Sequence, residues 1–90
     1  MPDTDSAKQQ IREEIQRLAT ASNNDASDIT DDDIIPVLGV LDSMDLLRLI
    51  SWYEKTFHLN IPEDEITIDN FGTINAMATY ALDRADRGAA

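Results

Sequence analysis

The sequence predicts a small all-α domain: a four-helix bundle with a long loop between the first and second helices and a short third helix. Apolar residues recur at helical spacing in three separate segments, and turn-forming residues separate those segments. No segment alternates apolar and polar residues as a strand would, and no internal repeat stands out. The length suits a single domain over residues 1–90, which we expect to be folded from about residue 6 to residue 84, with frayed termini.

The first helix is predicted from Ser6 to about Thr20. Ser6 and Gln9 have the spacing of a capping box, and the apolar stripe that follows consists of Ala7, Ile11, Ile15 and Leu18. From Ala21 to Leu41 the chain is rich in Asn, Asp, Pro and Gly, which favour turns. We expect a long ordered loop there, with room for one short turn. Its apolar segment 34–38 should hold it to the core. Its run 31–33 of aspartates should form a solvated stretch, with weak cation binding as the alternative.

The second helix is predicted to begin after Asp42, its N-cap, and to run to about Phe57 or His58. Its buried face consists of Leu46, Leu49, Ile50, Tyr53 and Phe57. Pro62 lies just beyond it, and the segment from Glu63 to Ile68 has room only for a short helical turn.

Residues Asn70-Phe71-Gly72 are predicted to form a break before the last helix. That helix should begin near Thr73 and fray from Arg84 onward. Its buried stripe consists of Ile74, Met77, Ala78, Ala81 and Leu82.

Charge and composition argue against several classes of function. Eighteen acidic and seven basic residues give a formal charge of −11, which repels nucleic acid and anionic membranes and favours partners with basic surfaces. The chain has no cysteine, so it can form neither a disulfide nor a thiolate metal site, and it has no thiol of its own. The first residues do not resemble a signal peptide, and the apolar run from Ile34 to Leu41 is too short to cross a bilayer. We expect a cytoplasmic monomer that binds neither nucleic acid nor membranes.

The segment from Leu38 to Leu47 is the best candidate for a functional site. Gly39 allows a sharp turn, Asp42 caps the second helix, and Ser43 takes its first position, so the serine hydroxyl should face solvent. An anion attached there would meet unpaired N–H groups and the positive end of the helix dipole. Asp42 and Asp45 would oppose that anion but could hold a divalent cation during its transfer. Taken alone, Asp42 and Ser43 also suit ordinary helix capping.

Three sequence motifs, of which this segment holds the first, follow one another along most of the chain. They are Leu-Gly-x-x-Asp-Ser-Met-Asp-x-x-x-Leu from Leu38, then Phe57-x-x-x-Ile61-Pro62, then Thr73 at the start of the last helix. In this order they resemble the acyl carrier and peptidyl carrier protein family, which implies a bundle of the acyl-carrier type. The Asp-Ser-Leu core of that family reads Asp-Ser-Met here.

The resemblance implies that Ser43 receives 4′-phosphopantetheine from coenzyme A, with Asp42 as the helix cap beside the transfer site. The protein would then be a carrier and not an enzyme, and its working thiol would lie at the end of the arm. The implied partners are a phosphopantetheinyl transferase, a ligase that loads the thiol, and a downstream acyl or aminoacyl acceptor enzyme.

The cargo is predicted from two further features. The segment 69–76 looks like that of carriers of D-alanine and other amino acids, and Arg48 and Lys55 replace residues that are typically acidic in fatty acid carriers. Both favour a stand-alone carrier whose aminoacyl thioester is delivered by a separate ATP-dependent ligase. The alternatives are an acyl carrier for fatty acid or polyketide synthesis, and an unmodified acidic helical adaptor or inhibitor.

The outer face of the second helix is predicted to dock partner proteins. On a helical wheel at about 100° per residue it gathers Met44, Arg48, Ser51, Trp52 and Lys55, which we expect to be exposed together. Trp52 could instead pack against the long loop. His58 lies roughly 22 Å along the same helix from Ser43, too far for a catalytic Ser-His couple. The acidic loop lacks the EF-hand pattern, and we expect no metal site.

Overall fold

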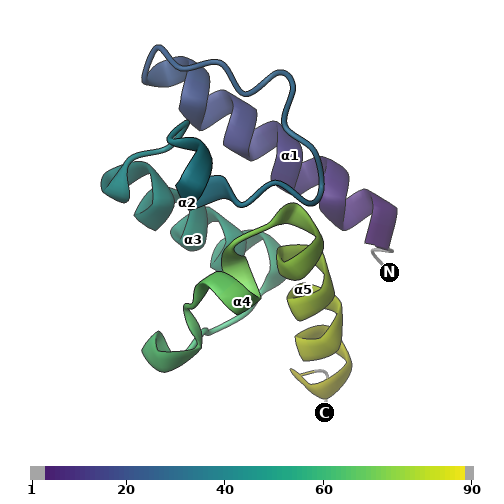
Figure 1. Ribbon diagram of the computed structural model, residues 1–90. Helices are drawn as coiled ribbons and strands as arrows, with labels where there is room; N and C mark the ends of the chain where they lie inside the picture. Colours follow the sequence, from purple (N-terminus) through teal and green to yellow (C-terminus); the bar gives the residue numbers. More distant parts are fainter. Residues whose placement is uncertain (1–3, 89–90) are drawn as a thin grey trace.

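The computed structural model describes residues 4–88, with side chains through Arg84, and every regular element in this range is helical (Figure 1). Three long helices form the frame: α1 (Thr4–Ala21), α3 (Ser43–Phe57) and α5 (Ile74–Gly88). The short elements are α2 (Ile35–Leu38), the 3-10 turn η1 (Glu63–Glu65) and α4 (Ile68–Phe71). The all-α class is therefore confirmed, and helix α2 is the one short turn for which the predicted loop had room. No helix in the described range is both long enough and apolar enough to cross a membrane.

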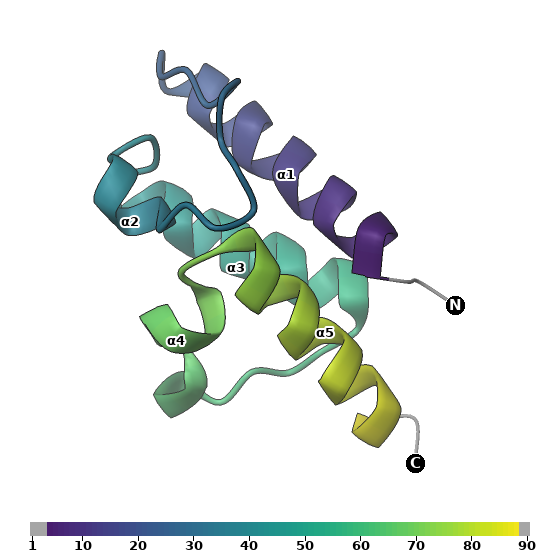
Figure 2. The same ribbon diagram turned by 45° about the vertical axis from the view of Figure 1, so that its right-hand side comes forward.

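The three long helices pack around one apolar core (Figure 2). Helix α1 packs against both α3 and α5, while α4 packs against α5 and lies away from α1 in both views. The apolar stripe predicted for the first helix is buried in full. Of the stripes predicted for the other two long helices, Leu49 and Tyr53 of α3 and four residues of α5 are buried. The remaining α3 residues of the stripe pack against the core from its edge, and Leu82 of α5 is partly exposed.

Tyr53 lies at the centre of this core and joins α3 to α5. Its side chain is 0% exposed, and its hydroxyl donates a hydrogen bond to the main-chain oxygen of Met77 at 2.7 Å. Its ring contacts the rings of Phe57 and Phe71, with centroid distances of 5.0 and 5.3 Å. The orientation of α3, which carries Ser43, is thereby tied to the last helix.

The start of α1 differs from the sequence prediction. The helix already includes Thr4, so Ser6 lies inside it and cannot be the N-cap. The hydroxyl of Ser6 instead accepts a hydrogen bond from Nε2 of Gln10 at 3.4 Å, one turn further along the helix. The predicted capping box of Ser6 and Gln9 is therefore wrong.

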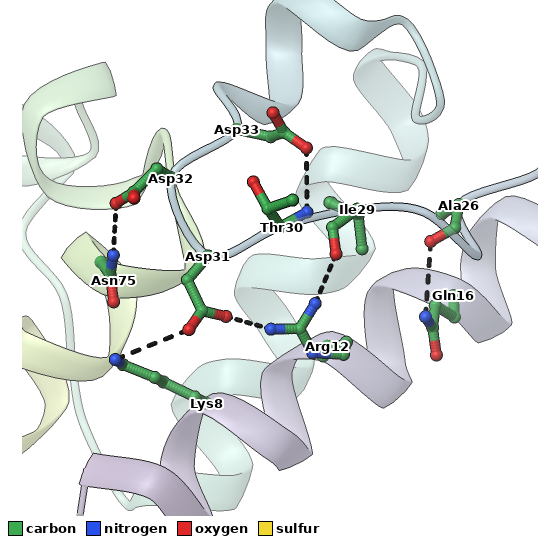
Figure 3. Close-up of polar contacts among 10 residues, drawn as sticks. All are labelled: Lys8, Arg12, Gln16, Ala26, Ile29, Thr30, Asp31, Asp32, Asp33 and Asn75. Atoms are coloured by element: carbon green, nitrogen blue, oxygen red, sulfur yellow. Dashed lines mark hydrogen bonds and ion pairs between the residues drawn. The ribbon is translucent and has the colours of Figure 1, made fainter.

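The loop between α1 and α2 is ordered by polar contacts (Figure 3). Arg12 of α1 donates to the main-chain oxygen of Ile29 at 2.5 Å and pairs with Asp31, which also faces Lys8 at 3.6 Å. On the other side, Nδ2 of Asn75 in α5 donates to Asp32 at 2.5 Å. The acidic run therefore ties the loop to two helices. The prediction of a solvated run is confirmed for Asp32, which is exposed, whereas Asp31 and Asp33 are only partly exposed.

Apolar anchoring of this loop is distributed differently from the prediction. Within the segment 34–38 only Ile35 is buried, whereas Ile34, Val37 and Leu38 are exposed. The other buried anchors are Ala26, Ile29 and Leu41, which lie on either side of that segment. A four-residue helix turns only one of its side chains inward here, so the remaining apolar residues of the segment face outward.

The region after α3 confirms one prediction and corrects another. The short turn predicted between Glu63 and Ile68 is η1. The break predicted at Asn70-Phe71-Gly72 is confirmed only at Gly72, which ends α4 before α5 begins. It is wrong for Asn70 and Phe71, which belong to α4, whose N-cap Thr67 accepts the N–H of Asn70 at 3.3 Å. A buried Phe71 between the rings of Tyr53 and Tyr80 holds this turn in place.

The last helix begins close to the predicted position. The hydroxyl of Thr73 accepts the N–H of Ala76 at 3.0 Å, directly before the first residue of α5. The helix continues through Gly88, beyond the position at which fraying was predicted. The expected fraying at the extreme ends, residues 1–3 and 89–90, lies outside the described residues.

Candidate functional site: an exposed serine at the start of helix α3

Ser43 is exposed and is the first residue of the 15-residue helix α3. The preceding Asp42 has the extended backbone of an N-cap (φ −84°, ψ −178°), and its carboxylate accepts the N–H of Asp45 at 2.8 Å. Its main-chain oxygen accepts the N–H of Leu46 at 2.9 Å and so begins the helical hydrogen bonding. The predicted start of this helix and the solvent-facing serine are confirmed.

Gly39 sets the approach of the chain to this site. It ends α2 with φ +72°, a left-handed conformation that favours glycine. Two residues later, Leu41 is buried and anchors the turn to the core. The chain therefore reaches Asp42 from a fixed direction, and Ser43 is presented from a rigid element.

Asp45 does not have the role that the sequence suggested. Its side chain is 1% exposed, one carboxylate oxygen accepts from the Ser22 hydroxyl at 2.7 Å, and the other accepts from Arg48 at 2.9 Å. The Ser22 hydrogen bond, followed by Arg48, holds the pKa of Asp45 below its ordinary value against the opposing effect of burial. With both oxygens engaged, Asp45 joins the end of α1 to α3, and the idea that it shares a cation with Asp42 is wrong.

An apolar pocket of about 370 Å³ opens beside Ser43. Helix α3 forms one wall and the segment from η1 to α4 forms the opposite wall; the main apolar residues are Leu46, Leu47, Ile50, Ile66, Ile68 and Phe71. This pocket was not predicted from the sequence. The available signal was the apolar pair Ile66 and Ile68, which the structure leaves exposed beside the pocket.

The outer wall of the pocket is held by a polar cluster around Glu65. Its carboxylate accepts from the Tyr80 hydroxyl at 2.5 Å and pairs with Arg84, both on α5. Nδ2 of Asn70 also donates to the main-chain oxygen of Glu65 at 2.8 Å. Burial, followed by the Glu65 hydrogen bond, raises the pKa of the Tyr80 hydroxyl.

Gly72 lies at the base of this wall, where there is no room for a larger residue. A Cβ atom at this position would lie 2.4 Å from the main-chain oxygen of Ile68. The main-chain oxygen of Gly72 also accepts the N–H of Ile35 at 2.7 Å, which connects α2 to the end of α4.

The five residues predicted to dock partners share one surface, with one correction. Met44, Arg48, Ser51 and Lys55 are exposed, but Trp52 is half-buried and packs edge-on against Phe57 at a centroid distance of 6.0 Å. The expectation that all five are exposed together is therefore wrong for Trp52, because the indole also reaches the core. All five line one groove of about 630 Å³ between α1 and α3.

His58 lies at the opposite end of α3 from Ser43. It is exposed and ends the helix in a left-handed conformation (φ 56°, ψ 48°). Among the described residues there is also no group of three or more histidine, aspartate or glutamate side chains placed to hold a metal ion. What the site offers is thus an exposed hydroxyl at a helix start, beside an apolar pocket.

The Ser43 hydroxyl lies exposed at the start of a long helix on a small all-α domain, where it is accessible for covalent modification. A model of the family described as "Phosphopantetheine attachment site" matches residues 9–81, which is most of the chain. The "Acyl carrier protein" of Onion yellows phytoplasma (strain OY-M) is 41% identical over 63 residues, covering 70% of this chain and 80% of the relative.

The chain therefore belongs to the phosphopantetheine-attachment family, which comprises acyl and peptidyl carrier proteins. Its cofactor is covalent 4′-phosphopantetheine, and members of the family are carriers and not catalysts. The residues at the start of α3 fit this group, because an exposed hydroxyl is available for attachment and the helix start suits a phosphodiester.

Proposed function

We propose that this protein carries an acyl thioester on a phosphopantetheine arm attached to Ser43. The observation that supports Ser43 is its exposed position at the first residue of α3, directly after the N-cap Asp42. When attached, the arm supplies the terminal thiol that the chain, with no cysteine, lacks. A phosphopantetheinyl transferase, a loading ligase and an acceptor enzyme are the proposed partners.

The local backbone explains why Ser43 suits this attachment. The first N–H groups of an α-helix have no partner within the helix, and the Asp42 carboxylate accepts only that of Asp45. The remaining donors and the positive end of the helix dipole favour a phosphodiester at Ser43. Since Asp45 is buried and already neutralised by Arg48, its charge opposes the anion only weakly.

The apolar pocket beside Ser43 favours a cargo with a hydrocarbon portion. Its volume of about 370 Å³ suits a short acyl chain, since ligand pockets run from about 300 to 1,000 Å³. The named residues of the pocket offer no carboxylate to an α-ammonium group, so burying that charged end of an aminoacyl cargo in the pocket would cost free energy. The name of the phytoplasma relative agrees with acyl cargo.

An aminoacyl thioester delivered by an ATP-dependent ligase is the second candidate. It is supported by the segment Asn70-Phe71-Gly72-Thr73 and by the basic residues Arg48 and Lys55, where fatty acid carriers are typically acidic. Such a cargo would stay in solvent at the end of the arm and would not need the pocket.

The attachment site is tested by treating the purified protein with coenzyme A and a broad-specificity phosphopantetheinyl transferase. Intact mass should show one added arm on the wild type and on Ser51→Ala, a control serine exposed on the same helix. Ser43→Ala should stay unmodified while its melting temperature is retained. A wild type that gains no mass would contradict the proposal and favour the unmodified adaptor.

The cargo is tested by comparing two thioesters, octanoyl and alanyl, loaded onto the same arm. If the pocket shelters hydrocarbon, Ile68→Asp should speed hydrolysis of the octanoyl thioester and leave that of the alanyl thioester unchanged. Ile68 is an exposed wall residue, so this variant should still fold. Equal hydrolysis of the octanoyl form in both proteins would favour the aminoacyl candidate.

A further inference from the structure

The groove between α1 and α3 presents positive charge on a strongly acidic protein. Three of the seven basic residues of the chain line it, namely Arg17 from α1 and Arg48 and Lys55 from α3. The side chains of Arg17 and Arg48 are 66% and 62% exposed. The sequence alone does not place Arg17 beside the other two, because it lies on another helix.

The two acidic residues of the groove are covered by these arginines. Glu14 pairs with Arg17 and Asp45 pairs with Arg48, and the acidic side chains are only 9% and 2% exposed. An arginine has five N–H donors, so one paired with a single carboxylate keeps donors for another. The five charged residues of the groove carry a net charge of +1, and the charged groups exposed to an approaching molecule are guanidinium and ammonium groups, although the formal charge of the chain is −11.

The groove also has an apolar part at the end nearer Ser43. Met44 and Leu47 are 58% and 61% exposed, and the half-buried Trp52 lies in the same groove. Methionine, tryptophan and arginine are enriched at protein interfaces, and tryptophan and arginine among the residues that dominate binding energy.

We propose that this groove docks a partner protein whose contact surface places acidic side chains around an apolar one, such as the face of an acidic amphipathic helix. The proposal rests on the proposed function for its purpose, since a partner seated here would lie beside Ser43. It differs from the expectation drawn from net charge, which favours basic partners. At contact distance the local cations determine which partner charge is attracted, because the charges of the rest of the protein are screened beyond about 8 Å at physiological ionic strength.

Trp52 offers a direct probe of this groove because it is the only tryptophan in the chain. The unmodified protein is titrated with two synthetic amphipathic helical peptides that share one apolar face, with glutamate on the polar face of one and lysine on that of the other. The acidic peptide should change the Trp52 emission saturably below about 1 mM at physiological salt, and the basic peptide should not.

Lys55→Glu is the discriminating variant, because Lys55 is exposed and no buried acid depends on it in the way that Asp45 depends on Arg48. This substitution should weaken binding of the acidic peptide about tenfold. The charge-matched control changes Thr79 and Ser27, both exposed outside the groove, to glutamate and should weaken it less than about twofold.

Three results would overturn the proposal: an equal or stronger response to the basic peptide, no response to either peptide up to about 1 mM, or equal weakening by Lys55→Glu and its control. These measurements use unmodified protein and do not depend on Ser43. A failed titration therefore overturns the docking groove alone, and failure of the proposed function is read separately from the mass measurement.

Discussion

Replacing Tyr53 by phenylalanine isolates one hydrogen bond in the centre of the fold. The hydroxyl of Tyr53 donates to the main-chain oxygen of Met77 at 2.7 Å, and the ring packs against Phe57 and Phe71. Phenylalanine keeps the ring contacts, and the Met77 oxygen, inside α5, can still accept its helical N–H. The expected loss in the free energy of unfolding is about 1 kcal/mol, which lowers the melting temperature of a domain this size by about 4–8 °C.

The same substitution has a consequence at alkaline pH. Burial, followed by the charge of Tyr80, raises the pKa of the Tyr53 hydroxyl above its ordinary value. A group whose pKa is raised by folding contributes stability that is complete below its unfolded pKa, near 10, and is lost as the pH rises through the folded value. The wild type should therefore lose stability above about pH 10. Tyr53→Phe should lose less stability over the same range, because only the loss due to Tyr80 remains in the variant.

Urea unfolding followed by circular dichroism measures both effects, at pH 7 and in steps from about pH 9 to 11. Wild-type stability in Tyr53→Phe at pH 7 would mean that the hydroxyl bond contributes nothing. Parallel alkaline profiles for the two proteins would show that Tyr53 is not the buried group that titrates.

Two further substitutions test the elements around the site. Gly39→Ala should lower the unfolding free energy by about 1–2 kcal/mol, because φ at this position is +72°. Gly39→Asn should cost less, since asparagine tolerates the left-handed conformation better. Equal stability of Gly39→Ala and the wild type would refute the left-handed turn. Trp52→Ala should cost about 2 kcal/mol, since the half-buried indole packs on Phe57, and Trp52→Phe should cost less. Thermal melting that leaves Trp52→Ala unchanged would place the indole wholly at the surface.

Local signals in the sequence were enough for the long helices and for the position of Ser43. Helical periodicity depends on residues three or four apart, so the buried stripe of α1 could be read directly from the chain. The start of α3 depends on Asp42 and the residues just after it, again within a few positions. The predicted site on Ser43 is therefore a consequence of short-range structure.

Tertiary structure alone decided which way the side chains around the site turn and what they meet. Asp45 is buried because Ser22, 23 residues earlier, reaches its carboxylate, and Arg17 joins Arg48 and Lys55 only because α1 packs against α3. The apolar pocket likewise needs the segment after η1 to be held opposite α3 by the polar cluster around Glu65. Such features depend on the packing of segments far apart in sequence, and local propensity and periodicity carry no information about it.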